Sequence, residues 1–503
     1  MRALRTWFPS GRAAAIAAAA AVVLIGALVA IPLVDESDDD ETAGRAVESG
    51  NVGGTGPGEG TITDEGTITG EGPGTEEATV GGPGGSGGAN ATGNSTREAG
   101  SGGRTATETG VTADTIKLGM LILNVGNVER LGIAVGVNPE QQRQAWRAYI
   151  AEVNEAGGIH GRTIEPVFKE YDVTQNDSQR AACLAMTEDH KVFAVLDIAL
   201  ITAHALCVAD EHETPLITLQ PMPREAYAKS DGRLFTLFAE GGRTWRNVAN
   251  DLHGRGALRG KTIGILGDTA PGNPETLKTL EEELGALGYK VAHRSKLASD
   301  GTTAQLPQAA SQIPVEVQAM RRANVDLVLM ATGNLTGTQF VQNADSQGYR
   351  PKYVVADWFN GYSDTYVQNM PDSFDGTLIT TNRTGEFRTD RPEPETEKRC
   401  RSIYERRSGE KLDRSTIAYN STLRLCTLLD VFVRGANAAT VNLTRGSLSS
   451  GLQGLGQLSL SSFGGGSYRP GKFDAADLIR TARFDPECNC WVPADDFRSP
   501  RYT

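Results

Sequence analysis

The sequence predicts an α/β fold of two doubly wound parallel-sheet lobes, preceded by an N-terminal transmembrane or signal helix and a disordered linker. Three observations lead to this prediction. From Val111 onward, buried-type strands alternate with single helices, which is typical of β-α-β units and a parallel sheet. The alternation breaks near residues 238–245 and then resumes, which indicates two similar lobes. The first 110 residues differ in composition from everything that follows them.

An uncharged apolar run occupies residues 13–34, after a basic tail at 1–12. About 22 apolar residues are long enough to cross a bilayer core of roughly 30 Å. The acidic run DESDDDE (35–41) follows, so the charge pattern favours a cytoplasmic tail and an exported remainder. A cleaved signal peptide is the alternative. We therefore expect an extracytoplasmic protein that is tethered to the cell membrane by this helix, or secreted if the signal is cleaved.

Residues 35–110 form a low-complexity stretch rich in Gly, Thr, Ser and Glu, with the near-repeat EGTITDEGTITGEG at 59–72. Such a segment buries too little apolar surface to offset its chain entropy, so we interpret it as a flexible linker. It holds fifteen acidic and three basic residues, which is nearly all of the net charge of −13. The remainder is close to neutral, so nucleic acid is not expected as a partner.

The six cysteines all lie in the part of the chain that is expected to be exported. An even number of cysteines outside the cytoplasm suggests disulfides, although reduced core cysteines are an alternative. No histidine lies near the C-x-C motif at its end, and we expect neither a metal nor a cofactor. The order along the chain suggests three local pairs: Cys183 with Cys207, Cys400 with Cys426, and Cys488 with Cys490.

The first β-α-β unit is clearly patterned. TIKLGMLIL (115–123) and RTIEPVFKEYD (162–172) are strand-like, and the helix between them closes at Gly157–Gly158. Two glycines allow the chain to leave the helix in a left-handed turn. After the break, KTIGILGD (261–268) opens the second series of strands and helices.

The stretch NEAGGIHGR (154–162) follows the recurrent pattern N-x-A-G-G-I-x-G-R, and together with the strands around it resembles the first unit of type I periplasmic binding proteins. The resemblance is to the branched-chain amino-acid and amide branch of that family. It extends over about residues 111–503, because KTIGILGD and LEEELGALGYKV are similar to the opening of the family's second lobe. The glycines of the pattern are expected to be structural.

The resemblance implies two lobes that close like a clam shell on a solute. Three crossings of the chain are expected near residues 237–241, 372–376 and 472–478. Lobe 1 would then comprise 111–237 with 376–475, and lobe 2 would comprise 241–372 with 476–503.

The implied function is that of an extracytoplasmic solute-binding protein. It would capture a small polar solute, such as an amino acid or amide, and deliver it to the permease of an ABC importer. The alternative is a ligand-sensing receptor domain for a partner membrane protein. No set of nucleophile, base or metal ligands is readable, so an enzyme is not expected.

The solute is expected at the loops that follow the strands. In the family pattern, Thr202 stands where a hydroxyl binds the ligand carboxylate, and Asp357 stands where an acid binds the α-ammonium group. Two expected aromatic residues are missing, near Pro271 and near Gly333. Thr202 could instead cap a helix at 203–211, and Asp357 could cap a turn. The candidate ligand-binding residues are Asn124, Thr202, Gln220, Asp268, Asn334, Asp357 and Trp358.

Overall fold

The computed structural model describes residues 104–500, apart from 125, 127–135, 301, 359–360 and 386–391. The expected tail, the apolar run at 13–34 and the linker up to residue 103 lie outside the described residues. Within the described ranges, no helix has both the length and the apolar character that a membrane span requires.

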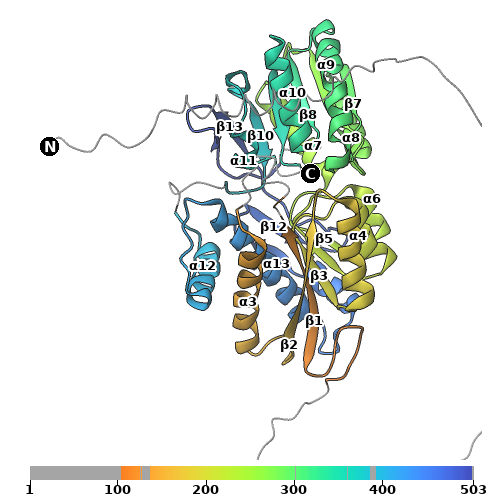
Figure 1. The fold of residues 1–503 in the computed structure, drawn as a ribbon, viewed down its shortest axis with the longest axis vertical. Coiled ribbons are helices and arrows are strands. Elements are labelled where there is room, and N and C mark those ends of the chain that lie inside the picture. Colours follow the sequence, from red (N-terminus) through yellow and green to blue (C-terminus); the bar gives the residue numbers. More distant parts are fainter. Residues whose placement is uncertain are drawn as a thin grey trace, which may run out of the picture. The chain divides into compact units, whose positions relative to one another are not determined.

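The first lobe is built on a five-stranded, fully parallel sheet with the order β2-β1-β3-β4-β5 (Figure 1). Alternate residues of its long first strand enter different cores, as the two-residue period of a strand requires. The strands are β1 (Thr115–Asn124), β2 (Thr163–Asp172), β3 (Ala194–Asp197), β4 (Leu216–Thr218) and β5 (Leu234–Thr236).

Helices cover both faces of this sheet, and each face has its own apolar core. One face packs against α3 (Pro139–Glu155), α12 (Glu395–Ser408), α13 (Ile417–Ala438) and α14 (Arg445–Gln453). The other face packs against α4 (Asn176–Leu184), η1 (Ala185–Asp189), α5 (Thr202–Leu206), η2 (Cys207–Glu211) and α6 (Arg224–Lys229).

The second lobe has a seven-stranded sheet with the order β14-β13-β10-β9-β8-β6-β7. Five strands are parallel, but the last two form an antiparallel hairpin, which the expectation of a purely parallel sheet did not include. The strands are β6 (Ile263–Asp268), β7 (Val291–Leu297), β8 (Leu327–Ala331), β9 (Lys352–Ala356), β10 (Leu378–Thr381), β13 (Arg480–Asp485) and β14 (Cys490–Pro493).

The helices of the second lobe also cover both faces of its sheet. One face packs against α7 (Gly241–Gly254) and α8 (Asn273–Ala286). The other packs against α9 (Leu306–Arg322), α10 (Asn334–Ser346) and α11 (Asp364–Val367). Short 3-10 turns are η3 (Thr303–Gln305) and η4 (Asp372–Phe374), and a small ribbon joins β11 (Gly456–Ser459) to β12 (Gly465–Tyr468).

The chain passes between the lobes three times: after β5, after β10 and after β12. The second passage begins after Thr381, and not at 372–376 as expected. The reason is that Leu378–Thr381 pairs with β9 and β13, so this strand belongs to the second sheet and not to the first lobe. In the third passage, Asp474 forms a bridge with Thr236 at the end of β5.

The folded part also begins earlier than residue 111, where we expected the first lobe to start after a linker that ends at 110. The Arg104 guanidinium donates to the carbonyl of Gly161, and the Thr107 hydroxyl donates to the carbonyl of Leu443. Residues 104–110 are therefore packed on the first lobe, since polar contacts hold them to the turn at 157–162 and to the start of α14.

The turn at 154–162 shows why its sequence pattern is restrictive. Gly158 has a φ of +68°, and a Cβ at this position would lie 2.0 Å from the carbonyl oxygen of Arg162. The Asn154 side chain bonds both the N–H and the carbonyl of Ile164, at 2.7 and 3.0 Å. Ile159 is fully buried in the core. The pattern thus encodes the passage from α3 into β2.

Arg162, the last residue of this pattern, is a fully buried clamp. Its guanidinium donates to the carbonyls of Thr112, Thr105 and Val441, at 2.7, 3.2 and 2.9 Å. Thr112 lies just before β1, Thr105 lies in the segment 104–110, and Val441 lies in the loop after α13. One cation therefore ties three distant segments to the first β-α-β unit.

Three disulfides are present, and they join the expected pairs. Cys183–Cys207 links α4 to η2, and Cys400–Cys426 links α12 to α13. Cys488–Cys490 lies in the turn between β13 and β14.

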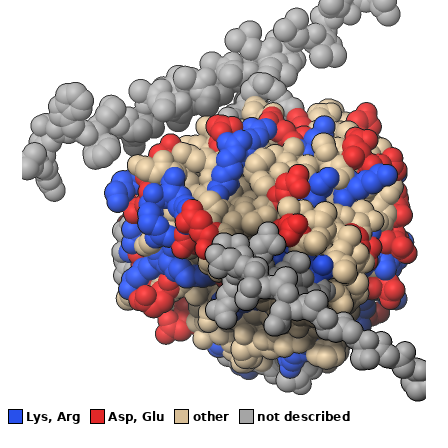
Figure 2. Space-filling model, turned by 90° about the horizontal axis from the view of Figure 1, so that it is seen from below, with Lys and Arg blue, Asp and Glu red and all other residues tan. Residues whose placement is uncertain are grey.

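Helix α12 is held to α3 by ion pairs on the surface of the first lobe. Arg407 contacts Glu152 and Glu155, and Arg406 also contacts Glu152. Seen from below, acidic and basic side chains lie side by side over the face of this lobe (Figure 2). Such exposed pairs each contribute only about 0–1 kcal/mol, so the cores carry the stability of this lobe.

Replacing Arg162 with Met keeps much of the side-chain volume but removes the donors to three carbonyls. We expect the free energy of unfolding to fall by about 2–4 kcal/mol, because those buried acceptors lose their partners. Urea denaturation of the folded region measures this. Arg147→Met, at a side chain that is 57% exposed, is the matched control and should cost less than about 1 kcal/mol. Equal losses in the two variants would contradict the clamp.

Candidate functional site

The carboxyl ends of the parallel strands in the two lobes face a common region between the lobes, which is where ligands bind in sheets of this kind (Figure 1). At the edge formed by β2 and β7, the loops of the two lobes meet directly. The Thr303 N–H donates to the Thr174 carbonyl at 3.3 Å, and Gln175 donates to the Thr303 hydroxyl at 3.3 Å. Asn176 donates to Asp300, also at 3.3 Å. We call this set of contacts the front contact.

The opposite edge of this region is the hinge. There the Thr236 N–H donates to the Phe473 carbonyl at 2.9 Å, and the Ala475 N–H donates to the Thr236 carbonyl at 2.8 Å. Between the two edges, Gly272 of the second lobe approaches Pro223 of the first so closely that a Cβ on Gly272 would lie 2.4 Å from the Pro223 ring. The interlobe region is therefore bounded on two sides by contacts between the lobes.

In the first lobe, one buried carboxylate organises the strand ends. Asp197, the last residue of β3, accepts hydrogen bonds from the Tyr171 hydroxyl and the Thr218 hydroxyl at 2.9 and 2.8 Å. It also accepts from the N–H groups of Ala199 and Leu200, at 3.0 and 2.8 Å. Burial raises the pKa of Asp197 although these four hydrogen bonds oppose it. The loops after β3 and β4 are thereby fixed to each other.

Thr202 and Gln220 lie on these two loops. Thr202 is the first residue of α5 and is partly exposed. The N-cap of that helix is Ile201, so the alternative that Thr202 caps a helix at 203–211 is wrong. Gln220 is also partly exposed, and its N–H donates to the Thr218 hydroxyl at 3.1 Å. Both side chains thus stand at the strand ends, where a solute is expected.

Asn124 has a more local role. Its amide donates to Glu170 at 2.6 Å, and its carbonyl oxygen accepts from the Gly126 N–H at 3.0 Å. These contacts tie the end of β1 to the neighbouring strand β2.

Asp268 has the corresponding bracing role in the second lobe. It is buried at the end of β6 and accepts from the Asn273 amide at 2.6 Å and the Thr332 hydroxyl at 2.7 Å. The N–H groups of Ala270 and Gly333 also donate to it, at 3.1 and 3.0 Å. Burial raises the pKa of Asp268 against these four hydrogen bonds. It therefore positions the loops after β6 and β8, and the partly exposed Asn334 begins α10 directly after the second of them.

Asp357 differs from the expectation that it offers a negative charge to a ligand's ammonium group. Its buried carboxylate accepts from Arg383 through Nε at 2.8 Å and Nη2 at 2.7 Å. The Thr381 hydroxyl and the Tyr362 N–H, the latter at 3.2 Å, donate to the same carboxylate. A cation of the protein itself therefore occupies the position that we had assigned to the ligand. The contact with Tyr362 matches the alternative that Asp357 caps a turn.

Arg383 also contacts two aromatic rings, Phe238 from the first passage and Tyr362 from the loop after β9. Its guanidinium lies 5.4 Å from the ring centre of Phe238 and 5.6 Å from that of Tyr362. Arg480 lies 5.6 Å from the Tyr362 ring and donates to its hydroxyl at 3.0 Å. Phe238 belongs to the first passage, Arg383 to the second, and Arg480 ends the third. We call Asp357 and these four residues the hinge cluster.

Trp358 packs inside the second lobe. It is buried in the core beneath α7 and α8, and a Cβ on Gly241 would lie 2.6 Å from its ring. Its ring therefore packs against α7, the helix that follows the first passage, and its role as a ligand contact stays a prediction.

The sequence reasoning missed Arg383, Asp197 and Arg480. The available signal for Arg383 was a single cation in the stretch TTNRTG (380–385), directly after a buried strand. An Asp directly after the apolar run KVFAVL (191–196) was the signal for Asp197. Nothing in the pattern around Arg480 indicated its place beside Tyr362.

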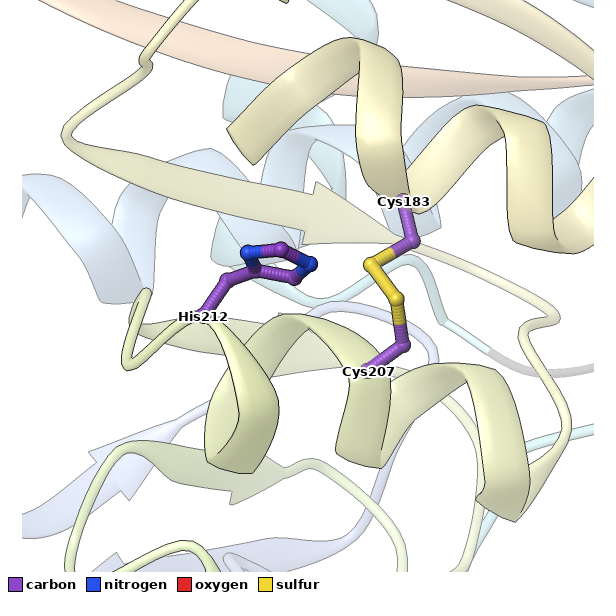
Figure 3. Close-up of side chains that lie close together, drawn as sticks. All are labelled: Cys183, Cys207 and His212. Carbon is purple, nitrogen blue, oxygen red and sulfur yellow. A yellow bond between two sulfur atoms is a disulfide. The ribbon is translucent and has the colours of Figure 1, made fainter. Parts of the chain in front are cut away.

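One group of potential metal ligands occurs among the described residues, and it does not form a metal site. Ligand atoms of Cys183, Cys207 and His212 lie within 4.8 Å of one another (Figure 3). The two sulfur atoms are joined in a disulfide, so neither is available as the thiolate that a metal requires.

The sequence matches the family model for periplasmic binding proteins over residues 115–478. The chain belongs to the periplasmic binding protein family, whose members are ligand-binding transport proteins rather than enzymes. This confirms the resemblance to the type I, Leu/Ile/Val-binding-like proteins. No curated protein matches the sequence significantly.

Solved structures of transport proteins share the fold at low sequence identity. A fatty acid ABC transporter substrate-binding protein from Thermomonospora curvata is 16% identical with a TM-score of 0.58, covering 79% of this chain and 95% of its own. A solute-binding protein from R. palustris in complex with 4-hydroxybenzoate is 15% identical with a TM-score of 0.58, covering 77% and 98%. A leucine-binding protein from Thermotoga maritima is 13% identical with a TM-score of 0.55, covering 76% and 99%. At such identities the likeness establishes the fold.

Asp357→Asn and Arg383→Met should each lower the free energy of unfolding by about 3–5 kcal/mol, because each leaves one buried partner uncompensated. The double variant should lose clearly less than the sum, and chemical denaturation of all four proteins measures the coupling. Asp345→Asn, which breaks the pair with the 65%-exposed Arg350, is the control and should cost less than about 1 kcal/mol. Strictly additive losses would show that the two side chains do not act as a pair.

Proposed function

We propose that this protein is an extracytoplasmic solute-binding protein that captures a small carboxylate-bearing solute between its lobes and delivers it to an ABC importer. The proposal rests on family membership for the binding role. The pairing of Asp357 with Arg383 carries the choice of solute.

An amino acid carries an ammonium group that loses its hydration when a cleft closes on it. Such a cation is costly to bury without an acidic partner. Asp357 is already neutralised by Arg383, and the buried Asp197 and Asp268 each accept four hydrogen bonds from the protein. These three carboxylates are thus already bound by other groups of the protein. A solute that lacks the ammonium group avoids this cost.

The carboxylate of such a solute has suitable partners at the same strand ends. Helices α5 and α10 both begin there, and helix N-termini favour anions through their N–H groups and dipole. Thr202 and Asn334 are the first residues of these two helices, and Gln220 lies on the neighbouring loop. We propose these three side chains as solute contacts.

The permease partner and the membrane tether follow from the same proposal. A solute-binding protein acts outside the cytoplasm and needs a membrane partner that accepts its solute. The apolar run at 13–34 would keep it close to that partner.

Matched solutes that differ only in the ammonium group test this proposal. Leucine should bind at least about tenfold more weakly than 4-methylpentanoate, which has the same carbon skeleton but no ammonium group. A cost of about 1.4 kcal/mol for burying the unpaired ammonium group is enough for that ratio. A thermal-shift screen that also includes 4-hydroxybenzoate identifies binders, and isothermal titration gives their affinities.

Thr202→Val keeps the shape of the side chain but removes its hydroxyl, and it should weaken the best carboxylate several-fold without changing the melting temperature of the free protein. Arg350→Ala, which lies before the amino end of β9 and is 65% exposed, is the control. Tighter binding of leucine than of 4-methylpentanoate would reject the choice of solute. Absence of binding by every small acid and amino acid would reject the solute-binding role.

A further inference from the structure

A second cavity lies beside the hinge, away from the strand ends that form the expected solute site. Its volume is about 840 Å³, within the range of small-molecule sites. Its walls come from α6 of the first lobe, from α7 of the second lobe and from the third passage between them. Both lobes thus contribute side chains to one cavity.

The lining of this cavity carries an excess of positive charge. Five basic and three acidic side chains line it, which gives a net charge of +2. The basic residues are Arg224, Arg243, Arg246, Arg469 and Lys472.

Two of the three acidic side chains, Asp474 and Glu240, accept hydrogen bonds from other groups of the protein. Asp474 is buried and accepts from Arg243 Nε at 2.9 Å and from the Glu240 N–H. Glu240 caps α7, because its carboxylate accepts from the N–H groups of Gly242 and Arg243 at 2.6 and 3.0 Å. Glu240 and Asp474 thus fix the wall, and the five cations of the lining still outnumber the three acids that pair with them.

Two guanidinium groups at this cavity are only loosely held. Arg224 is 69% exposed and reaches Glu240 at 4.0 Å, the limit of an ion pair. Arg469 is 64% exposed and reaches Asp477 at 3.9 Å. One comes from α6 and the other from the turn after β12, so they approach the cavity from different elements.

Lys472 adds a third, better-fixed cation between them. Its ammonium donates to the carbonyl of Ser467 at 2.7 Å and lies 3.3 Å from Asp477. Beside it the Phe473 ring, which also lines the cavity, stacks on Tyr227 with ring centres 6.4 Å apart. A cavity wall that carries two exposed guanidinium groups is suited to a ligand with several negative charges.

We propose that this hinge cavity is a second binding site, for a small polyvalent anion of the phosphate or polycarboxylate class, in which Arg224 and Arg469 close on the ligand. It is distinct from the solute site, because its lining includes none of the loops that follow β3, β6 or β8.

Isothermal titration at low ionic strength tests the proposal with two probes, pyrophosphate and citrate. At least one should bind saturably with a stoichiometry of one, and sodium chloride of the same ionic strength should not reproduce the heat. A tighter pyrophosphate places the ligand in the phosphate class, and a tighter citrate places it in the polycarboxylate class.

The double variant Arg224→Ala/Arg469→Ala should weaken that binding at least about tenfold, because two charge-assisted contacts are lost. Both side chains are mostly exposed, so its melting temperature should match that of the wild type. Arg350→Ala, equally exposed at 65%, is the matched control and should bind like the wild type. The proposal is overturned if neither anion binds saturably, or if the double variant binds as tightly as the control.

Discussion

The bidentate pair between Arg383 and Asp357 is the contact on which the hinge depends. A buried ion pair is costly to form, because both charges lose their hydration, and it persists only where further hydrogen bonds and close packing compensate. Here Thr381 and Tyr362 donate further hydrogen bonds to the Asp357 carboxylate. The rings of Phe238 and Tyr362 lie beside the Arg383 guanidinium. Because Asp357 lies in the second lobe, Arg383 in the second passage and Phe238 in the first, removing either charge would loosen the joint between the lobes as well as one loop.

The two lobes use a common device to hold their strand ends rigid. In each, a buried aspartate at the end of an interior strand accepts four hydrogen bonds from the loops and strands around it: Asp197 in the first lobe and Asp268 in the second. Burial raises the pKa of both carboxyl groups, which means that it disfavours their charged forms. Their function is best understood as positioning, because a site made of backbone N–H groups and short polar side chains needs loops that do not relax.

Local patterns predicted local features well. The alternation of strands and helices and the turn at 154–162 depend on residues that are close in the sequence, and each disulfide joins a cysteine to the next cysteine along the chain. The partner of Asp357 could not be read in this way. Arg383 lies 26 residues later, and the two meet only because β9 and β10 are neighbours in the sheet.

The second passage was misplaced for a similar reason. The turn-rich segment DSFDG (372–376) is typical of a crossing, but the short strand after it pairs back into the second sheet. The hinge cavity was also invisible in the sequence, since its walls come from α6, α7 and residues after 456. Features that depend on which distant segments become neighbours therefore require the structure.

The front contact between the lobes is weak compared with the hinge. It consists of hydrogen bonds of about 3.3 Å through Thr174, Gln175 and Asn176, with only one charged acceptor. Each such bond contributes roughly 0.5–1.5 kcal/mol, and water can replace it when the lobes separate. The joined and parted arrangements of this edge are then separated by only a few kcal/mol, an energy that a micromolar solute can easily supply. The hinge would stay fixed while the front contact opens and closes, and the occupancy of the cleft would then decide whether the lobes are joined or parted at this edge.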